Sequence, residues 1–226
     1  WSAEQTQKEQ IAALAHDLKT PLTVIQGNAD LMRETDLDGE QRLYMEYINS
    51  SSEQMQLYIK TLIDISRAAT GYQLHMENIN LADYVEYLRG QISALCQTKK
   101  TSLQVEVKNL PIILSADRLL LERAIMNVVN NALDFSPLNG SVYLSITGDN
   151  NNLRITITDT GNGFSREDLL HAQEQFYMAD HSRSSNLHFG MGLFITKSIV
   201  QQHGGQLILG NSDKTGGAQV TIKIPY

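Results

Sequence analysis

The sequence predicts an α+β protein, in which an N-terminal helical hairpin forms a dimeric four-helix bundle and a two-layer α/β sandwich follows. The first observation is that residues 4–35 carry small or apolar side chains at alternating spacings of four and three, the pattern of a coiled-coil seam. Residues 44–65 repeat this pattern. The second observation is that beyond residue 80 helical patterns are interspersed with short segments that alternate apolar and polar residues, as half-buried strands do. Such grouping is typical of helices packed on one face of a sheet.

The two seams predict more than a single hairpin. A polar turn at residues 36–39 separates them, so the two helices should fold back on each other. One hairpin cannot cover both seams together with further apolar side chains such as Leu14 and Ile59, whereas a second copy of the chain would cover them. We therefore expect a homodimer. The seam positions are Ile11, Ala15, Leu18, Leu22, Ile25, Ala29 and Met32 in the first helix, and Tyr44, Ile48, Ser51, Met55, Tyr58, Leu62 and Ile65 in the second.

A polar stretch at residues 71–80 is the predicted linker between the two domains. It contains Gly71 and follows the last apolar repeat of the hairpin. The predicted domains are therefore residues 1–70 and residues 81–226. Asn80 has the side chain of a helix N-cap and should start a helix that runs to about Cys96.

A polar stripe lies along the helix predicted for residues 118–135. Arg123, Asn127, Asn131 and Asp134 follow one another at spacings of four, four and three, so they share one side of this helix. Apolar residues occupy the rest of its surface, so the stripe should border the core. Buried amides need hydrogen-bond partners, and a ligand could supply them.

The remaining pattern completes the sandwich. Apolar and polar residues alternate where strands are expected, and glycine pairs or polar caps separate them. The predicted elements are strands at 103–107, 142–146, 153–157, 206–209 and 218–224, a short helix after Ser165, an irregular lid at 171–189, and a helix from Gly190 to about His203.

The composition excludes several classes of protein. A net charge of -7 argues against a surface for nucleic acid, because neutralising phosphates requires an excess of Lys and Arg. Cys96 is the only cysteine, which rules out a disulfide framework and fits a reducing compartment. No run of about 18 apolar residues is present, so no segment is expected to span a membrane. The chain opens on Trp1, which predicts a piece of a longer protein.

His16 is the candidate nucleophile of the hairpin. It lies one residue from the Ala15 seam position, so its imidazole should face solvent. Asp17 could hold its tautomer and accept its proton. Pro21 lacks an N–H donor and its ring clashes with the carbonyl of Asp17, so the helix should bend one turn from the histidine. The alternative interpretation is a surface histidine on a helix that happens to contain a proline.

Five motifs resemble those of bacterial two-component sensor histidine kinases, in the family's order and spacing. His16–Leu22 resembles the phosphoacceptor box, and Asn127–Leu133 the asparagine box. Asp159–Gly163 and Gly190–Leu193 are similar to the two glycine boxes, and Gln175–Tyr177 to the phenylalanine box. This resemblance implies a histidine kinase/gyrase-like ATPase fold for the second domain.

The resemblance also implies a nucleotide site. Asn131 matches the family's Mg²⁺ ligand, with Asn127 assisting, and Asp159 matches the aspartate that accepts the adenine amino proton. Glycines in the two boxes let the backbone approach the nucleotide and its phosphates. The residues implied to bind ATP are Asn127, Asn131, Asp159, Gly161, Gly163, Phe176, Tyr177, Arg183, Gly190, Gly192 and Leu193.

The implied reaction is transfer of the γ-phosphoryl group of ATP to Nε2 of His16, with Asp17 as general base. The phosphoryl group then passes to an aspartate on the receiver domain of a response regulator. Thr20 matches the position that members with phosphatase activity use to orient a hydrolytic water. The resemblance further implies the cytoplasmic portion of a cell-membrane sensor protein, attached through segments absent from this sequence.

Two rival functions stay open from the sequence. Asp134, Met178 and Phe194 stand where many members carry a lysine, an arginine and a glycine. Variation between subfamilies is the preferred explanation, and the alternative is a degenerate kinase that acts as a dimeric scaffold or phosphotransfer module. Arg183 and Lys197 could compensate for the missing cations. A gyrase- or MutL-type ATPase switch is disfavoured, because those enzymes place a glutamate where this chain has Asn127.

Overall fold

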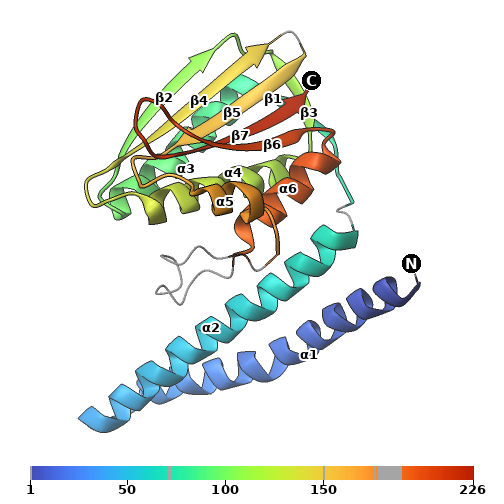
Figure 1. Ribbon diagram of the computed structural model, residues 1–226. Helices are drawn as coiled ribbons and strands as arrows, with labels where there is room; N and C mark the ends of the chain where they lie inside the picture. Colours follow the sequence, from blue (N-terminus) through green and yellow to red (C-terminus); the bar gives the residue numbers. More distant parts are fainter. Residues whose placement is uncertain (1, 71–72, 150, 176, 178–189) are drawn as a thin grey trace. The chain divides into compact units, whose positions relative to one another are not determined.

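The protein divides into two compact units, residues 1–70 and residues 71–226. The computed structural model describes residues 2–70, 73–149, 151–175, 177 and 190–226 (Figure 1). Within the helices of the first unit it describes no side chains for residues 2–17 and for part of residues 54–70. Among the described residues, no helix is both long and apolar enough to cross a membrane.

The first unit is a hairpin of two long helices, α1 (Ser2–Arg33) and α2 (Gly39–Thr70). The turn between them ends in reciprocal hydrogen bonds at the start of α2. The backbone N–H of Gln41 donates to Oδ1 of Asp38 at 2.8 Å, and the N–H of Asp38 donates to Oε1 of Gln41 at 3.0 Å. This capping pattern satisfies two N–H groups that the helix itself cannot pair. Pro21 lies inside α1, which stays helical through it.

Within one hairpin a single line of side chains on each helix is buried, and it coincides with the predicted seam only in α1. Among the described side chains, the buried ones lie seven residues apart along each helix, whereas the residues three positions after them stay exposed. In α2 the buried line also lies one residue beyond the predicted seam. The buried residues are Leu22 and Ala29 in α1 with Met45, Ser52 and Ile59 in α2; the exposed apolar seam residues are Leu18, Ile25 and Met32 with Tyr44, Ile48 and Met55.

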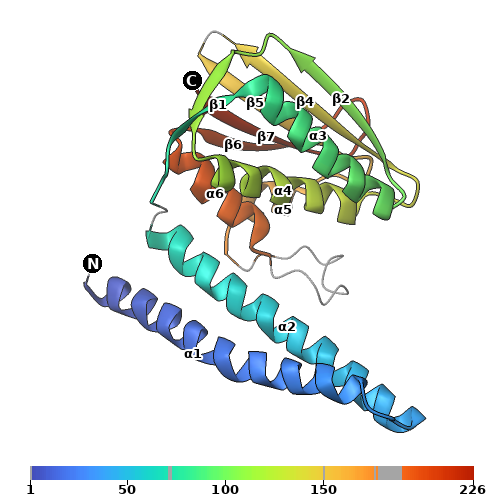
Figure 2. The same ribbon diagram turned by 180° about the vertical axis from the view of Figure 1, so that it is seen from behind.

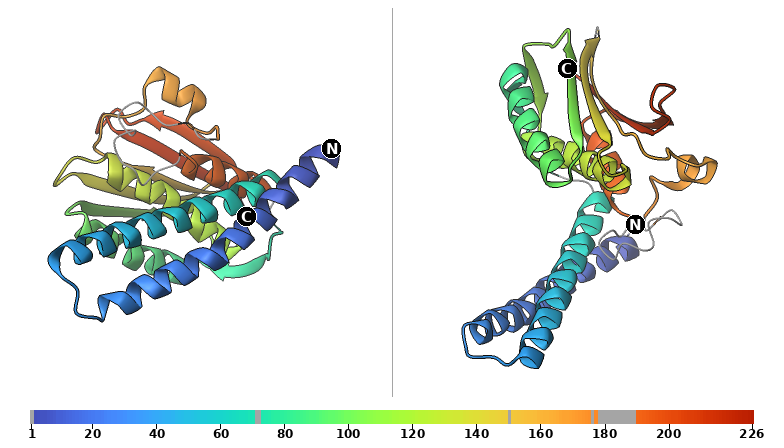
Figure 3. Two further views of the ribbon diagram at one scale, coloured as in Figure 1. Left: turned by 90° about the horizontal axis from the view of Figure 1, so that it is seen from below. Right: turned by 90° about the vertical axis from the view of Figure 1, so that its left-hand side faces the viewer.

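The second unit is a two-layer sandwich of helices on a sheet, which confirms the predicted fold class. Helices α3, α4 and α6 cover one face of a five-stranded sheet (Figures 2 and 3). The strand order is β2-β4-β5-β7-β6, in which β2 and β4 are parallel and the other pairs are antiparallel. The elements are β1 (Glu77–Asn80), α3 (Leu81–Thr98), β2 (Ser102–Lys108), β3 (Ile113–Ala116), α4 (Arg118–Phe135), β4 (Ser141–Asp149), β5 (Asn152–Thr158), α5 (Arg166–His171), α6 (Gly192–Gln202), β6 (Gln206–Asn211) and β7 (Ala218–Pro225).

The core lies between the sheet and its three helices. Every second residue of β4, β5 and β7 points into this layer, where apolar side chains of α3, α4 and α6 meet them. Burial of this apolar surface is the main force that holds the two layers together. The strands contribute Val142, Leu144, Ile146, Leu153, Ile155, Ile157, Val220, Ile222 and Ile224 to this core.

The predicted linker is wrong at its C-terminal end. Residues 77–80 form β1, which pairs antiparallel with β3, so that Glu77 lies opposite Ala116 and Asn80 opposite Ile113. Both strands have four residues, and in β1 only Ile79 is buried. Burial alternates in β3, but its exposed Ile113 is as apolar as its buried Leu114, so the sequence shows no recognisable alternation in either strand. Asn80 does cap α3 as expected, since its side chain accepts hydrogen bonds from the N–H groups of Ala82 and Asp83.

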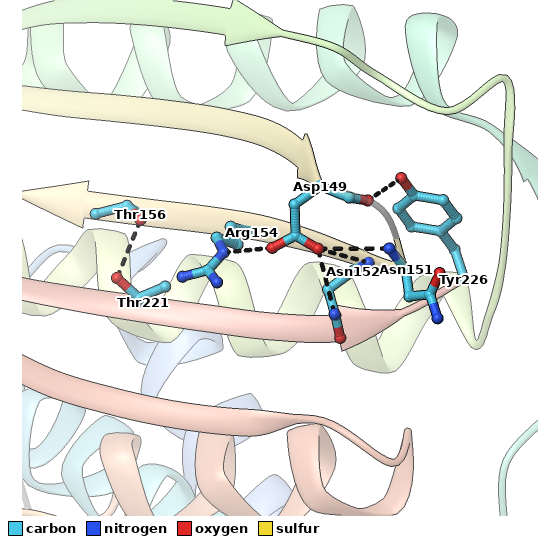
Figure 4. A network of polar contacts seen from close by, with 7 residues as sticks. All are labelled: Asp149, Asn151, Asn152, Arg154, Thr156, Thr221 and Tyr226. Carbon is cyan, nitrogen blue, oxygen red and sulfur yellow. Dashed lines mark hydrogen bonds and ion pairs between the residues drawn. The ribbon is translucent and has the colours of Figure 1, made fainter.

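A polar network closes the turn between β4 and β5 (Figure 4). The carboxylate of Asp149 accepts from Nε of Arg154 at 2.8 Å, and from the backbone N–H and the side-chain amide of Asn152 at 3.1 and 3.2 Å. The hydroxyl of Tyr226 donates to the backbone carbonyl of Asp149. The hydrogen bonds from Arg154 and Asn152 lower the pKa of the Asp149 carboxyl to about 2.

This pKa predicts a pH-dependent contribution to stability. A carboxyl whose pKa is lower in the folded protein stabilises the fold above its unfolded pKa of 3.8, and that contribution disappears as the pH falls toward about 2. In urea titrations, the gap in unfolding midpoint between the wild-type protein and Asp149→Asn should therefore be constant above about pH 5 and shrink to a small fraction of that value by about pH 2. Asp213→Asn, in an exposed turn, should show no such change in its gap between these two pH values. A gap at pH 2 as large as the gap at pH 5 would contradict the assignment.

Candidate functional site

Helix α4 carries the polar stripe, and hydrogen bonds of Asp117 and His203 hold the start of this helix in place. Oδ1 of Asp117 accepts from the N–H of Leu120 at 3.0 Å and so caps the start of α4. The N–H of Asp117 donates to Nε2 of the buried His203, which follows the end of α6, at 3.0 Å. Nδ1 of His203 lies 2.8 Å from the carbonyl of Ile199 and must donate to it, because a carbonyl only accepts. The start of α4 is thereby tied to the end of α6.

Asn127 and Asn131 lie beside the first residue of α6. The side-chain nitrogen of Asn127 donates to the carbonyl of Gly192 at 3.4 Å. A Cβ atom added at Gly192 would lie 3.6 and 3.7 Å from the amide atoms of Asn131. The two half-buried amides and the start of α6 therefore form one polar surface, whose amide oxygens are suitable ligands for Mg²⁺.

Asp159 is a buried carboxylate directly after β5. Its Oδ1 accepts from the N–H of Gly161 at 2.8 Å and from the N–H of Ala218 at 3.0 Å. Within the described part of the chain these bonds leave Oδ2 for a donor from outside the protein. Burial raises the pKa of this carboxyl, and the two backbone hydrogen bonds oppose that shift. A buried carboxylate with one oxygen left for a ligand is suited to accept from an amino group.

Two glycines of the Asp159 loop are needed for close backbone packing. A Cβ atom at Gly161 would lie 2.4 Å from the carbonyl oxygen of Phe135, at the end of α4. Gly163 has a φ angle of 72°, which disfavours other residues. The amide of Asn211 pairs with the backbone of Phe164, accepting from its N–H at 2.7 Å and donating to its carbonyl at 2.8 Å. This clamp holds the loop against the sheet.

The amides and the carboxylate of the site meet along α4. The Asp159 loop contacts Phe135 at the end of this helix, and Asn131 lies about one turn earlier on it, beside Gly192. Gly190 has a φ angle of 64°, and Leu193 is buried in the first turn of α6. The arrangement can therefore bind a ligand that carries an amino group at one end and anions at the other.

The other predicted site residues lie in parts that the structure describes only partly. Tyr177 donates its hydroxyl to Oδ1 of Asp168 at 2.9 Å, so it packs on α5. Phe176 and Arg183 lie outside the described residues, as does most of the expected lid. His16 and Asp17 lie on α1, but their side chains are outside the description, so the expected solvent-facing position of His16 is not tested.

Three residues that contact Asp159 were not predicted as site residues from the sequence. The hydroxyl of Thr215 donates to the carbonyl of Asp159 at 2.8 Å, and Ala218 supplies one of the two bonds to its carboxylate. A Cβ atom at Gly217 would lie 2.1 Å from the Asp159 carbonyl oxygen. The adjacent glycines 216 and 217 are the only hint in the sequence, and two glycines before a strand are also typical of an ordinary turn.

Both units match sequence models of known families. Residues 6–71 match the His Kinase A (phospho-acceptor) domain. Residues 116–226 match the histidine kinase-, DNA gyrase B- and HSP90-like ATPase family.

Curated proteins and a solved structure are similar over nearly the whole chain. The sensor histidine kinase SpaK of Bacillus subtilis is 40% identical over 225 residues, which are 100% of this chain and 49% of SpaK. The nisin biosynthesis sensor protein NisK of Lactococcus lactis is 32% identical, over 95% of this chain and 48% of NisK. The chain thus spans about half the length of these relatives. The structure of full-length ShkA in complex with AMPPNP has a TM-score of 0.80 at 25% identity, over 96% of this chain and 45% of ShkA.

The two domain families occur in one chain, and their order is the order predicted for the two domains. The chain belongs to the two-component sensor histidine kinases, of which it carries the phosphoacceptor domain and the ATPase-like domain.

Proposed function

We propose that this chain binds ATP with Mg²⁺ in its second unit and transfers the γ-phosphoryl group to Nε2 of His16. The observation that carries the proposal is the site along α4, where the Asp159 loop packs on the end of the helix that carries Asn127 and Asn131. Oδ2 of Asp159, which the described residues leave for an outside donor, would accept from the adenine amino group. The ShkA structure, which contains the ATP analogue AMPPNP, supports this choice of ligand.

Mg²⁺ would be held by the amide oxygen of Asn131, with Asn127 beside it. The ion would neutralise part of the charge on the phosphates, which is the main requirement of phosphoryl transfer. Gly192 at the start of α6 leaves room for the phosphates, and its helix begins with N–H groups that favour anions. Asp17, next to His16, would accept the imidazole proton as general base.

A kinase fits this site better than an ATP hydrolase. Hydrolysis requires a side chain that activates water, and Asn127, the residue in the position of the gyrase-type glutamate, is an amide whose nitrogen donates to Gly192. An amide is not a general base. The hairpin, with its histidine, also has no role in a hydrolase.

The phosphoryl group would pass from His16 to an aspartate on a response regulator receiver domain. Thr20 is exposed and lies four residues after His16, so the two residues share one side of α1. We propose that the regulator docks on this side, and that Thr20 orients the water that hydrolyses the regulator's phosphoaspartate. In the intact protein this unit would lie in the cytoplasm, beneath a membrane-bound sensor.

The exposed apolar seam residues support a homodimer. In both helices the exposed line follows the buried line by three residues, and in antiparallel helices this offset places both lines on the same side of the hairpin. Ile25 and Met32 belong to this side. A second copy would cover it and complete a four-helix bundle.

Charges on this side should dissociate the dimer. Ile25→Glu combined with Met32→Glu should give a monomer mass in analytical ultracentrifugation, because burying the unpaired carboxylates is costly. The matched control is Val24→Glu with Leu31→Glu. Both control residues are exposed, and Leu31 lies about two and a half turns from the buried Leu22, hence on the opposite side of α1. The control pair should leave the dimer intact; a monomeric control with a dimeric Ile25/Met32 variant would refute this arrangement.

Incubation of the chain with γ-phosphate-labelled ATP and Mg²⁺ tests the proposed function. A kinase acquires label that is stable in base and lost in acid, as expected of a phosphohistidine. Free phosphate without labelled protein would instead indicate a hydrolase. Neither product, together with an intact dimer, would indicate a scaffold.

The position of the Asp134 carboxylate on the polar stripe of α4 favours the scaffold as a second candidate. Asp134 also forms an ion pair of 2.9 Å with Nζ of Lys99. This carboxylate stands one turn from Asn131, where a negative charge disfavours polyphosphate. The ion pair reduces that repulsion, so we retain the kinase as the first candidate.

A further inference from the structure

The carbonyl of Gly192 lies where α4 and α6 meet, and two side chains donate to it. One is the amide of Asn127, at 3.4 Å, and the other is the hydroxyl of Thr196, at 2.8 Å. Because a carbonyl only accepts, the Asn127 nitrogen must point toward Gly192 and its Oδ1 must point away. The orientation of this amide therefore depends on the position of the Gly192 carbonyl.

Thr196 is fully buried between the two helices. Its hydroxyl lies within hydrogen-bond distance of one carbonyl from each of them, Gly192 in α6 at 2.8 Å and Ala124 in α4 at 3.3 Å. Ala124 lies three residues before Asn127, so the hydroxyl spans the two helices about one turn from the amide. Both carbonyls only accept and the hydroxyl has one proton, so they share it in a bifurcated hydrogen bond, and separation of the helices would lose the longer contact, to Ala124.

We propose that Thr196 is a positioning residue for the cation site. Its hydroxyl fixes the first turn of α6 against α4 at the separation at which the Gly192 carbonyl can accept from Asn127. The amide is thereby held with Oδ1 available to a divalent cation or its bound water. This inference rests on the proposed binding of ATP with Mg²⁺, and it adds a residue that touches neither.

The test is calorimetric binding of AMPPNP to the whole chain, measured at increasing MgCl₂ and also in EDTA. Thr196→Val keeps the branched shape and removes the hydroxyl, whereas Thr196→Ser keeps the hydroxyl. The control is Thr156→Val, which also removes a hydrogen-bonded threonine hydroxyl, but one that pairs with Thr221 at 3.0 Å within the sheet (Figure 4). We expect Thr196→Val to raise the half-saturating MgCl₂ concentration about fivefold, with AMPPNP affinity in EDTA unchanged. Thr196→Ser and Thr156→Val should stay within about twofold of the wild-type value.

The outcomes separate this inference from the proposed function. Wild-type dependence on Mg²⁺ in Thr196→Val would overturn the role of Thr196 and leave the proposed function intact. Equal weakening in MgCl₂ and in EDTA would mean a purely structural role and would also overturn it. Absence of Mg²⁺-dependent binding in the wild-type chain would overturn both. If Thr196→Val does not fold, Thr196→Ala replaces it, because the smaller side chain cannot clash, and the same criteria apply.

Discussion

Replacing His16 with glutamine should remove all acid-labile label from the chain incubated with γ-phosphate-labelled ATP. Glutamine keeps a polar side chain on α1 but has no nucleophilic ring nitrogen, so no phosphoramidate can form. The residues proposed to bind the nucleotide all belong to the second unit, so AMPPNP affinity should be unchanged. The measurement is label on the denatured protein, after base and after acid, beside calorimetric affinity for AMPPNP.

The control for this variant is His75→Gln. His75 is exposed, and its backbone N–H donates to Oδ2 of Asp117 at 2.9 Å, a hydrogen bond that does not involve the imidazole. This control should label as the wild-type chain does. Residual acid-labile label in His16→Gln would mean that another histidine is the acceptor, and would remove the hairpin from the proposed mechanism.

The sequence predicts long periodic elements well and short ones poorly. Helix α4 has the bounds that its pattern predicts, and the caps at Asn80 and Ser165 occur as expected, because each is a local interaction between neighbouring residues. The pair β1–β3 was missed, because four residues on either strand are too few for an alternation to emerge. A strand of that length is specified by its partner.

The hairpin shows a different limit. Spacings of four and three identify an apolar face, but they do not tell which residues face the same chain and which face a second copy. The burial of Leu22 and Met45 beside the exposure of Ile25 and Ile48 divides the face into two lines. Only the packing of α1 on α2 makes that division, since both lines have the same heptad period.

The residues of the candidate site also fall into two groups, those that the sequence spacing reveals and those that it does not. Asn127, Asn131 and Gly192 come from motifs that sequence spacing reveals, and the structure brings them together. Thr215 and Asn211 were missed, because they act on Asp159 and Phe164 through backbone atoms 56 and 47 residues away. No local pattern encodes a contact over that separation, so such residues emerge only from the folded sheet.

Asp159→Asn should weaken ATP binding about 10- to 100-fold without destabilising the protein. Asparagine can still accept from Gly161 and Ala218 through Oδ1, so the loop keeps both hydrogen bonds. Its nitrogen replaces Oδ2, however, and then opposes the adenine amino group with a second donor. Loss of a hydrogen bond to a charged acceptor costs about 1.5–3 kcal/mol, which corresponds to that decrease in affinity.

Stability should change in the opposite direction, which distinguishes a binding residue from a structural one. Burial raises the pKa of Asp159, so its charged form is disfavoured in the folded protein; its contribution to stability is present below the unfolded pKa of 3.8 and is lost as the pH rises. At pH 7 the uncharged Asp159→Asn variant should therefore unfold at an equal or higher urea concentration than the wild type.

Acidification should weaken ATP binding by the wild-type protein, as Asp159 is protonated, but not by the variant. Inosine triphosphate carries a carbonyl in place of the amino group. The ratio of its affinity to the affinity for ATP should therefore be higher in the variant than in the wild type. A variant that loses stability and affinity together, with no change in base preference, would show that Asp159 only supports the loop.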